Sequence, residues 1–228
     1  MDEDFLFRKG NGKSKILLVF FGGMGTSNDP TLINKKLPFE FIKLTDEHFN
    51  QNDRLFFADH HQCWYHKGYL KNKIVDIDDT AKLINDVINK CSTDNKKIIF
   101  IGISSGGYAA ILFGSILHVN TVLAIKPQTN LNYLEVDGMV GGKSSFRIKK
   151  INLNQKYLNL SLVLNNKTKY ICYGDLSVRQ NTNCHHVLQC RNINKFKNVK
   201  VRELNKLDIK LMSTNGELLK ILNIYIVD

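Results

Sequence analysis

The sequence predicts an α/β fold with a mainly parallel β-sheet, and three observations indicate it. Residues 98–103 form an apolar run that leads into a small-residue turn, as expected of a buried parallel strand. Residues 76–89 carry apolar side chains at helical spacing. Strand and helix patterns alternate along the whole chain, which is typical of a sheet covered by helices. The 228 residues show no linker or internal repeat, so we expect a single domain, 1–228.

The order of the elements follows from the same patterns. Residues 5–8 and 15–21 flank a turn-rich segment and predict a hairpin or paired strands. Further strands are expected at 54–58, 98–103, 120–125, 169–173 and 199–204. Helices are expected at 38–42, 76–89, 106–117, 185–192 and 216–226. Residues from about 128 to 165 follow neither pattern, and we expect them to form a small cap insertion over the sheet.

Composition and charge narrow the function classes. The net charge is +11, but the basic residues are spread along the chain, so no nucleic-acid partner is expected. No apolar run approaches the ~20 residues that span a membrane, and the acidic N-terminus lacks the apolar core of a signal peptide. The five scattered cysteines suit reduced thiols better than disulfides. We therefore expect a cytoplasmic protein that has no membrane partner.

The main functional signal is a Gly-x-Ser-x-Gly motif formed by Gly102, Ser104 and Gly106. An expected buried strand precedes it and an expected helix follows it. In that setting a serine sits on a strained strand-to-helix turn, and the flanking glycines let the neighbouring backbone come close. The hydroxyl then projects above the sheet near a helix N-terminus, which favours negative charge. Ser104 is therefore the candidate nucleophile.

Four features in order resemble the α/β-hydrolase superfamily over nearly the whole chain, and more narrowly a group of small serine hydrolases of bacterial and large-DNA-virus type. They are a Phe-Phe-Gly-Gly loop (20–23), a Gln-x-Trp-Tyr segment (62–65), a Gly-x-Ser-x-Gly-Gly-Tyr-Ala-Ala elbow (102–110) and a Pro-Gln pair (127–128). The resemblance implies a three-layer α/β-hydrolase-like sandwich. It also implies that the oxyanion hole is formed by backbone N–H groups of Ser105 and of the loop Gly22, Gly23 and Met24.

The acid and the base depart from the superfamily pattern. The superfamily runs Ser, acid, His, with the histidine after the last strand. Here no histidine follows His186, and the loop after the last expected strand has none. The candidate acid is Asp175, directly after a strand, and the candidate base is His185 or His186, with a preference for His185. A relocated base is physically allowed, because a triad is defined by geometry and role.

Two functions follow from these residues. The first is a serine hydrolase that acts on an ester or thioester of a small acyl substrate through an acyl-serine intermediate, without cofactor or metal. The alternative is a catalytically degenerate protein that serves as an acyl- or carboxylate-binding module, which the missing late histidine favours.

The loop 59–66 holds three histidines and the only tryptophan. His60, His61 and His66 lack a recognisable ligand framework, so an aromatic loop over the mouth of the site is favoured over a metal centre. Trp64 and Tyr65 are accordingly the candidate substrate-binding residues.

Two further motifs are rejected. Cys184, His185, His186 and Cys190 are suitable metal ligands, but they lack the paired spacing of a zinc site. The segment 141–144, Gly-Gly-Lys-Ser, resembles part of a phosphate loop. It has neither the first glycine nor a preceding buried strand.

Overall fold

The fold is taken from a computed structural model of the 228-residue chain. It describes residues 4–23, 38–68, 76–91, 97–132, 153–177, 185–205, 212 and 216–226. The segment 141–144 and two of the candidate residues, Met24 and Cys184, lie outside the described residues.

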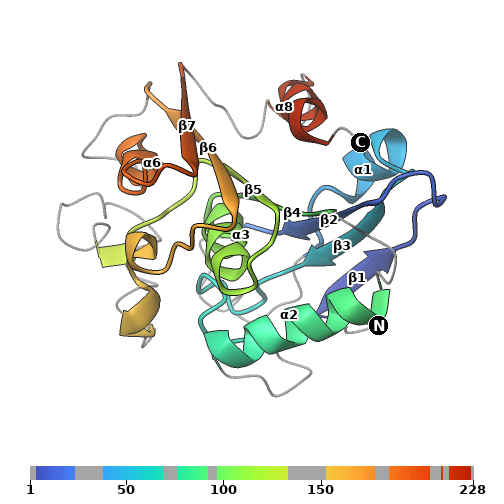
Figure 1. Cartoon of the computed structure of the whole chain (residues 1–228), viewed down its shortest axis with the longest axis horizontal. Helices are drawn as coiled ribbons and strands as arrows, with labels where there is room; N and C mark the ends of the chain where they lie inside the picture. Colours follow the sequence, from blue (N-terminus) through green and yellow to red (C-terminus); the bar gives the residue numbers. More distant parts are fainter. Residues whose placement is uncertain are drawn as a thin grey trace.

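A seven-stranded sheet runs through the centre of the molecule (Figure 1). Its strand order is β1-β3-β2-β4-β5-β6-β7, and every neighbouring pair is parallel except β1 and β3. The strands are β1 (Phe5–Arg8), β2 (Ile16–Phe21), β3 (Asp53–Phe57), β4 (Lys97–Ile103), β5 (Thr121–Ile125), β6 (Lys169–Asp175) and β7 (Val199–Leu204). The predicted α/β class with a mainly parallel sheet is confirmed.

The two N-terminal strands do not pair with each other, so both predicted arrangements, a hairpin and paired strands, are wrong. β1 pairs antiparallel with β3, with Phe5 opposite Phe57, while β2 lies between β3 and β4. The reason is burial: all six residues of β2 are buried, whereas β1 is only partly covered. A strand that is apolar on both faces belongs in the interior of a sheet, and the less apolar strand belongs at its edge.

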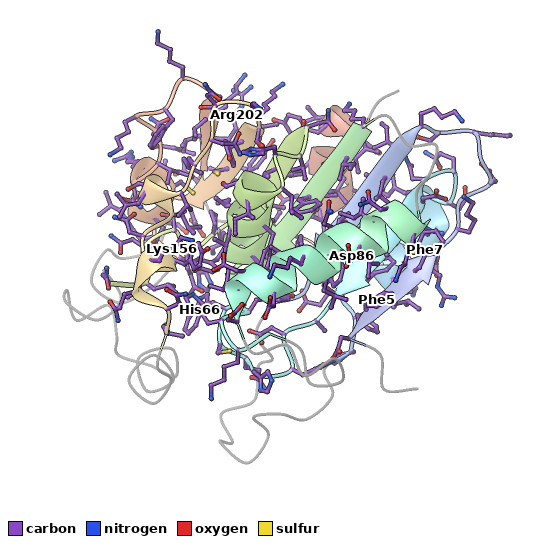
Figure 2. All side chains as sticks on the ribbon, turned by 60° about the horizontal axis from the view of Figure 1, so that its bottom comes forward. Phe5, Phe7, His66, Asp86, Lys156 and Arg202 are labelled. Atoms are coloured by element: carbon purple, nitrogen blue, oxygen red, sulfur yellow. The ribbon has the colours of Figure 1, made fainter. Side chains whose placement is uncertain are left out.

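Helices cover both faces of the sheet. α2 (Ile77–Cys91), α3 (Ser105–Ile116) and the short α6 (Leu188–Arg191) contribute to the apolar core on one face. α1 (Ile42–His48) and α8 (Glu217–Tyr225) pack on the other face. Figure 1 shows α2 and α3 on the side of the sheet opposite to α1 and α8. In Figure 2, Phe5 and Phe7 of β1 lie near the C-terminal end of α2. Both side chains pack against the apolar core to which α2 contributes.

The described part of the expected cap insertion packs into the α3 side of the molecule. It contains two short 3-10 helices, η2 (Gln155–Tyr157) and η3 (Leu160–Leu162). The Leu131 N–H donates to the Leu158 carbonyl at 2.7 Å, and the Leu160 N–H donates to the Thr129 carbonyl at 2.8 Å. Leu158 and Leu160 are buried in the same core as α3. The described part of this segment therefore packs in the apolar core on the α3 side of the sheet. Residues 133–152 lie outside the described residues.

Candidate active site

Ser104 lies at a strained turn between β4 and α3. Its φ is 58° and its ψ is −122°, a backbone conformation that a residue other than glycine rarely adopts. The Ser104 N–H donates to the Ile125 carbonyl at 2.9 Å, which ties the turn to the end of β5. The side chain is only partly buried and lies immediately before the first turn of α3. This is the geometry of a nucleophile elbow.

The two flanking glycines are required by close backbone contacts. A Cβ atom on Gly102 would lie 2.1 Å from the Gly106 carbonyl oxygen. A Cβ atom on Gly106 would lie 2.2 Å from the Phe21 carbonyl oxygen at the end of β2. Both distances are far below van der Waals contact. The spacing of the motif therefore follows from how tightly α3 packs on β4 and β2.

His185 contacts Ser104, the candidate nucleophile. Its Nε2 lies 2.6 Å from Ser104 Oγ. In the tautomer that carries its proton on Nδ1, the serine hydroxyl donates to Nε2, which is the arrangement a general base requires. Burial lowers the pKa of His185 to about 4, and the positive charge of Lys126 adds to this effect while Asp175 opposes it. The imidazole is therefore neutral at physiological pH and can accept a proton.

Asp175 ends β6 at the same edge of the sheet. Its Oδ2 accepts a hydrogen bond from Lys126 Nζ at 2.8 Å, and its Oδ1 accepts from the N–H and the hydroxyl of Ser177. Burial alone would raise the pKa of Asp175, but the bonds from Lys126 and Ser177 outweigh it and lower the pKa to about 2. The carboxylate is thus ionised, and its charge acts on His185.

His186 is directed differently from its neighbour. It forms a parallel bridge with Asp175, and its Nδ1 accepts a hydrogen bond from the Leu188 N–H at 3.2 Å at the start of α6. The next residue, Val187, donates its N–H to the Asp175 carbonyl. Of the two adjacent candidates, His185 contacts Ser104, whereas the His186 side chain accepts a hydrogen bond at the N-terminus of α6.

The glycine loop after β2 lies against the elbow. The Gly22 N–H donates to the Phe57 carbonyl at 2.9 Å, so this donor belongs to the sheet and is not available to a substrate in this structure. The Gly23 N–H instead donates to Glu40 Oε2 at 3.1 Å. A Cβ atom on Gly23 would lie 3.4 Å from the Ile103 carbonyl oxygen, next to Ser104. Ser105, the other predicted donor, is the first residue of α3.

Trp64 and Tyr65 are fully buried, so neither offers an exposed surface to a substrate. Tyr65 donates its hydroxyl to the Gly22 carbonyl at 3.0 Å, and Trp64 Nε1 donates to Gln128 Oε1 at 2.6 Å. Both side chains therefore hold loops of the site in place. The Trp64–Gln128 bond also joins the second and fourth of the sequence motifs.

The loop that carries these aromatic residues is wound around a buried carboxylate. Asp59 Oδ2 accepts hydrogen bonds from the N–H groups of Cys63 and Tyr65, and three residues of the loop have positive φ: Gln62, Trp64 and Tyr65. Burial raises the pKa of Asp59 to about 6. His66, which Figure 2 shows beside the beginning of α2, has its Nε2 2.7 Å from the Tyr108 hydroxyl. Within the described residues, no group of three or more His, Cys, Asp or Glu side chains is arranged to hold a metal ion.

Sequence reasoning missed two charged residues of the site, Lys126 and Glu40. Lys126 directly follows the buried strand β5, and its place at the carboxyl end of a parallel strand was a usable signal. Glu40 lies in an aromatic segment, Pro38–Phe41, and nothing local connects it with Gly23. Only the tertiary structure reveals that contact.

Several solved structures have a fold similar to that of this chain. The capsule O-acetyltransferase of Neisseria meningitidis serogroup A aligns with a TM-score of 0.61 at 16% identity, covering 96% of this chain and 89% of that chain. A lipase-esterase related protein from Clostridium acetobutylicum aligns with a TM-score of 0.59 at 15% identity, covering 96% and 98%. An esterase of Pyrococcus furiosus aligns with a TM-score of 0.57 at 16% identity, covering 92% and 80%. The chain has the α/β-hydrolase fold.

Sequence comparison adds one partial match. The family model of the prolyl oligopeptidase family (Peptidase_S9) matches residues 58–114, which contain the loop 59–66, α2, β4 and most of α3. The sequence similarity of this chain to that family therefore covers the segment that contains the elbow. No curated protein sequence matches the chain significantly. In the described part of the chain, every helix is too short or too polar to cross a membrane.

Proposed function

We propose that the protein is a serine hydrolase or acyltransferase that acts on an ester or thioester through an acyl-serine at Ser104. The observation that carries the proposal is the 2.6 Å contact between Ser104 Oγ and His185 Nε2 at a strained elbow. A nucleophile next to a neutral base, with a carboxylate acting on that base, is the arrangement that acyl transfer requires.

Each residue has a defined part in the reaction. Ser104 Oγ attacks the acyl carbonyl while its proton passes to His185 Nε2, and Asp175 stabilises the imidazolium that forms. The backbone N–H of Ser105 donates to the oxyanion, and the N–H of Gly23 does so once its hydrogen bond to Glu40 is released. His185 then returns the proton to the leaving alcohol or thiol. A water molecule, or the hydroxyl of a second substrate, releases the acyl group by the same steps in reverse.

The comparisons support acyl chemistry in general but not one substrate. The similar structures include an esterase, a lipase-esterase related protein and an O-acetyltransferase. All three names describe handling of acyl groups. The same serine and base serve hydrolysis and transfer, so the choice between water and a second hydroxyl depends on the acceptor site.

A fluorophosphonate probe tests the proposal directly. Such a probe reacts with an activated serine and forms a covalent adduct that mass spectrometry assigns to one residue. We expect a single adduct on Ser104 in the wild type and none in Ser104→Ala. The matched control is Ser161→Ala, which removes a hydroxyl elsewhere on the α3 side and should leave labelling unchanged. An adduct that persists in Ser104→Ala contradicts the proposal.

The second candidate, a carboxylate-binding module, is favoured by one contact. The Gly23 N–H already holds a carboxylate, that of Glu40. A protein whose loop binds carboxylates without turning them over would give no serine adduct. It would still bind a short carboxylic acid in isothermal titration calorimetry, and that binding would survive Ser104→Ala.

A further inference from the structure

A buried lysine is paired with the acid of the site. Lys126 Nζ lies 2.8 Å from Asp175 Oδ2, and the side chains are only 8% and 3% exposed. Burying a charge is costly unless a partner compensates it, so an ion pair in this position is an arrangement that the fold must enforce.

The backbone of Lys126 shows how the pairing is enforced. Its φ is 49°, in the left-handed region that residues other than glycine avoid, and the next residue is proline. The Lys126 N–H donates to the Tyr173 carbonyl at 2.7 Å, which fixes the end of β5 against β6. Strained conformations of this kind persist where the surrounding structure holds them, and they cluster at functional sites.

The carboxylate is therefore shared among several groups. Lys126 occupies Oδ2 and Ser177 occupies Oδ1, while His185 lies within the electrostatic reach of both Asp175 and Lys126. In an isolated acid–base pair the carboxylate alone raises the basicity of the imidazole. Here a positive charge is paired with that carboxylate, and its effect on the imidazole is opposite to that of the carboxylate.

We propose that Lys126 is a positioning residue of the catalytic group: its charge holds the Asp175 carboxylate in place at the end of β6, where the Asp175 backbone contacts His186 and Val187 next to His185, and the pair acts together on His185. This inference rests on the proposed function of Ser104. It extends the Ser–His–Asp arrangement to a fourth residue, which acts through Asp175 and does not touch the substrate.

The charges around His185 agree with this role. The imidazole faces Ser104 at the elbow, Lys126 at the end of β5 and Asp175 at the end of β6. Its neighbour His186 is influenced by Arg191 of α6, whose guanidinium is itself paired with Glu203 of β7. Burial and Lys126 lower the pKa of His185, and Asp175 alone raises it. Lys126 is thus the one charged side chain found to lower it, among the residues that the structure describes.

Two variants separate the charge of Lys126 from its hydrogen bond. Lys126→Gln keeps a donor to Asp175 but has no charge, and Lys126→Arg keeps the charge. Lys82→Gln is the matched control, because Lys82 also pairs with a carboxylate at 2.8 Å but on the exposed face of α2. The readout is the rate of Ser104 labelling by a fluorophosphonate between pH 4 and pH 9.

We expect the midpoint of the wild-type pH profile near the pKa of about 4 of His185. In Lys126→Gln the midpoint should rise towards the ordinary histidine value, but stay below it because the imidazole remains buried. Lys126→Arg should restore the low midpoint, and Lys82→Gln should match the wild type. An unchanged midpoint in folded Lys126→Gln overturns the inference.

A second measurement does not depend on activity. The ring signals of His185 in NMR, assigned by their absence from His185→Gln, report its pKa directly. If Lys126→Gln does not fold, the comparison is made between Asp175→Asn and the double variant Asp175→Asn/Lys126→Gln, in which the buried pair is neutral. The pKa of His185 must be higher in the double variant, and equal values overturn the inference. An unlabelled Ser104 together with a shifted pKa would refute only the proposed function.

Discussion

His185 Nε2 lies 2.6 Å from Ser104 Oγ, although 81 residues separate them in the chain. The contact is made before the last strand, because His185 lies between β6 and α6 and β7 follows it. Its position is held by the Val187 N–H, which donates to the Asp175 carbonyl, and by the bridge between His186 and Asp175. A base can therefore reach the elbow from the β6 side of the sheet, without the loop after the last strand.

The adjacent histidines provide a direct test of this placement. His185→Gln should lower the rate of Ser104 labelling by about 10²- to 10⁴-fold, the usual contribution of a general base. His186→Gln should keep the rate within about tenfold, because His186 contacts the start of α6 and not Ser104. The rates are compared at pH 7.5 with circular dichroism as the control for folding. A larger loss in His186→Gln than in His185→Gln would reverse the assignment.

The fold was largely predictable because its central strands, β2 to β6, are largely buried. A long apolar run such as residues 98–103 predicts a buried strand directly from the sequence, and this run lies in β4. The predicted hairpin or pairing of residues 5–8 with 15–21 was wrong, because a turn signal between two strands does not show which of them needs two neighbours. That choice depends on the burial of β2, a property of the whole sheet.

The site was predictable only where its residues follow a local rule. Ser104 lies in a Gly-x-Ser-x-Gly motif between an expected strand and an expected helix, and Asp175 ends a strand. Glu40 and Lys126 act over long range, on Gly23 and Asp175, and no spacing encodes such contacts. The pKa of about 4 for His185 also departs from the ordinary value, because burial and a neighbouring charge arise only in the folded protein.

The two consecutive glycines of the elbow should respond unequally to alanine. Gly106→Ala would place a Cβ atom 2.2 Å from the Phe21 carbonyl oxygen, and backbone there cannot move without disturbing β2. We expect it to cost about 1–3 kcal/mol of unfolding free energy, as overpacking usually does. In Gly107→Ala the nearest atoms, in Pro127, lie at 3.1 and 3.2 Å, so the cost should be smaller. Urea unfolding measures both, and equal costs would contradict the packing argument.

Glu40 should restrain the glycine loop of Gly22 and Gly23, for which we propose a role in binding the oxyanion. Its carboxylate accepts the hydrogen bond that the Gly23 N–H would donate to a reacting carbonyl oxygen. Glu40→Ala frees this donor, so we expect faster labelling of Ser104 by a fluorophosphonate. Glu40→Gln keeps the contact with a neutral acceptor and should give an intermediate rate. Glu47→Ala, on the exposed surface of α1, is the control. A slower reaction in Glu40→Ala would mean that Glu40 supports the loop.

The stability of the protein should fall in acid partly because of His185. The pKa of this imidazole is lowered by burial to about 4 in the folded chain, against an ordinary value of about 6.5 in the unfolded chain. The unfolded state therefore binds the proton first as the pH falls. The stabilisation is complete above about pH 6.5 and is lost progressively down to about pH 4.

Other groups change stability over the same range, so the variant must be compared with the wild type. His66, whose pKa burial also lowers to about 4, acts in the same direction as His185. Asp59, whose pKa is raised to about 6, acts in the opposite direction, because its protonated form is favoured in the folded state. Both contributions are common to the wild type and His185→Gln and cancel in the difference.

We expect the wild type to lose up to about 2 kcal/mol more unfolding free energy than His185→Gln between pH 7.5 and pH 5, from about 1.4 kcal/mol per unit of pKa difference. Urea unfolding followed by tryptophan fluorescence measures both curves, since the single tryptophan, Trp64, is fully buried. Parallel curves over this range would show that His185 titrates alike in the folded and unfolded chains. In that case the imidazole would not be buried against Ser104, and its assignment as the neutral base would have to be abandoned.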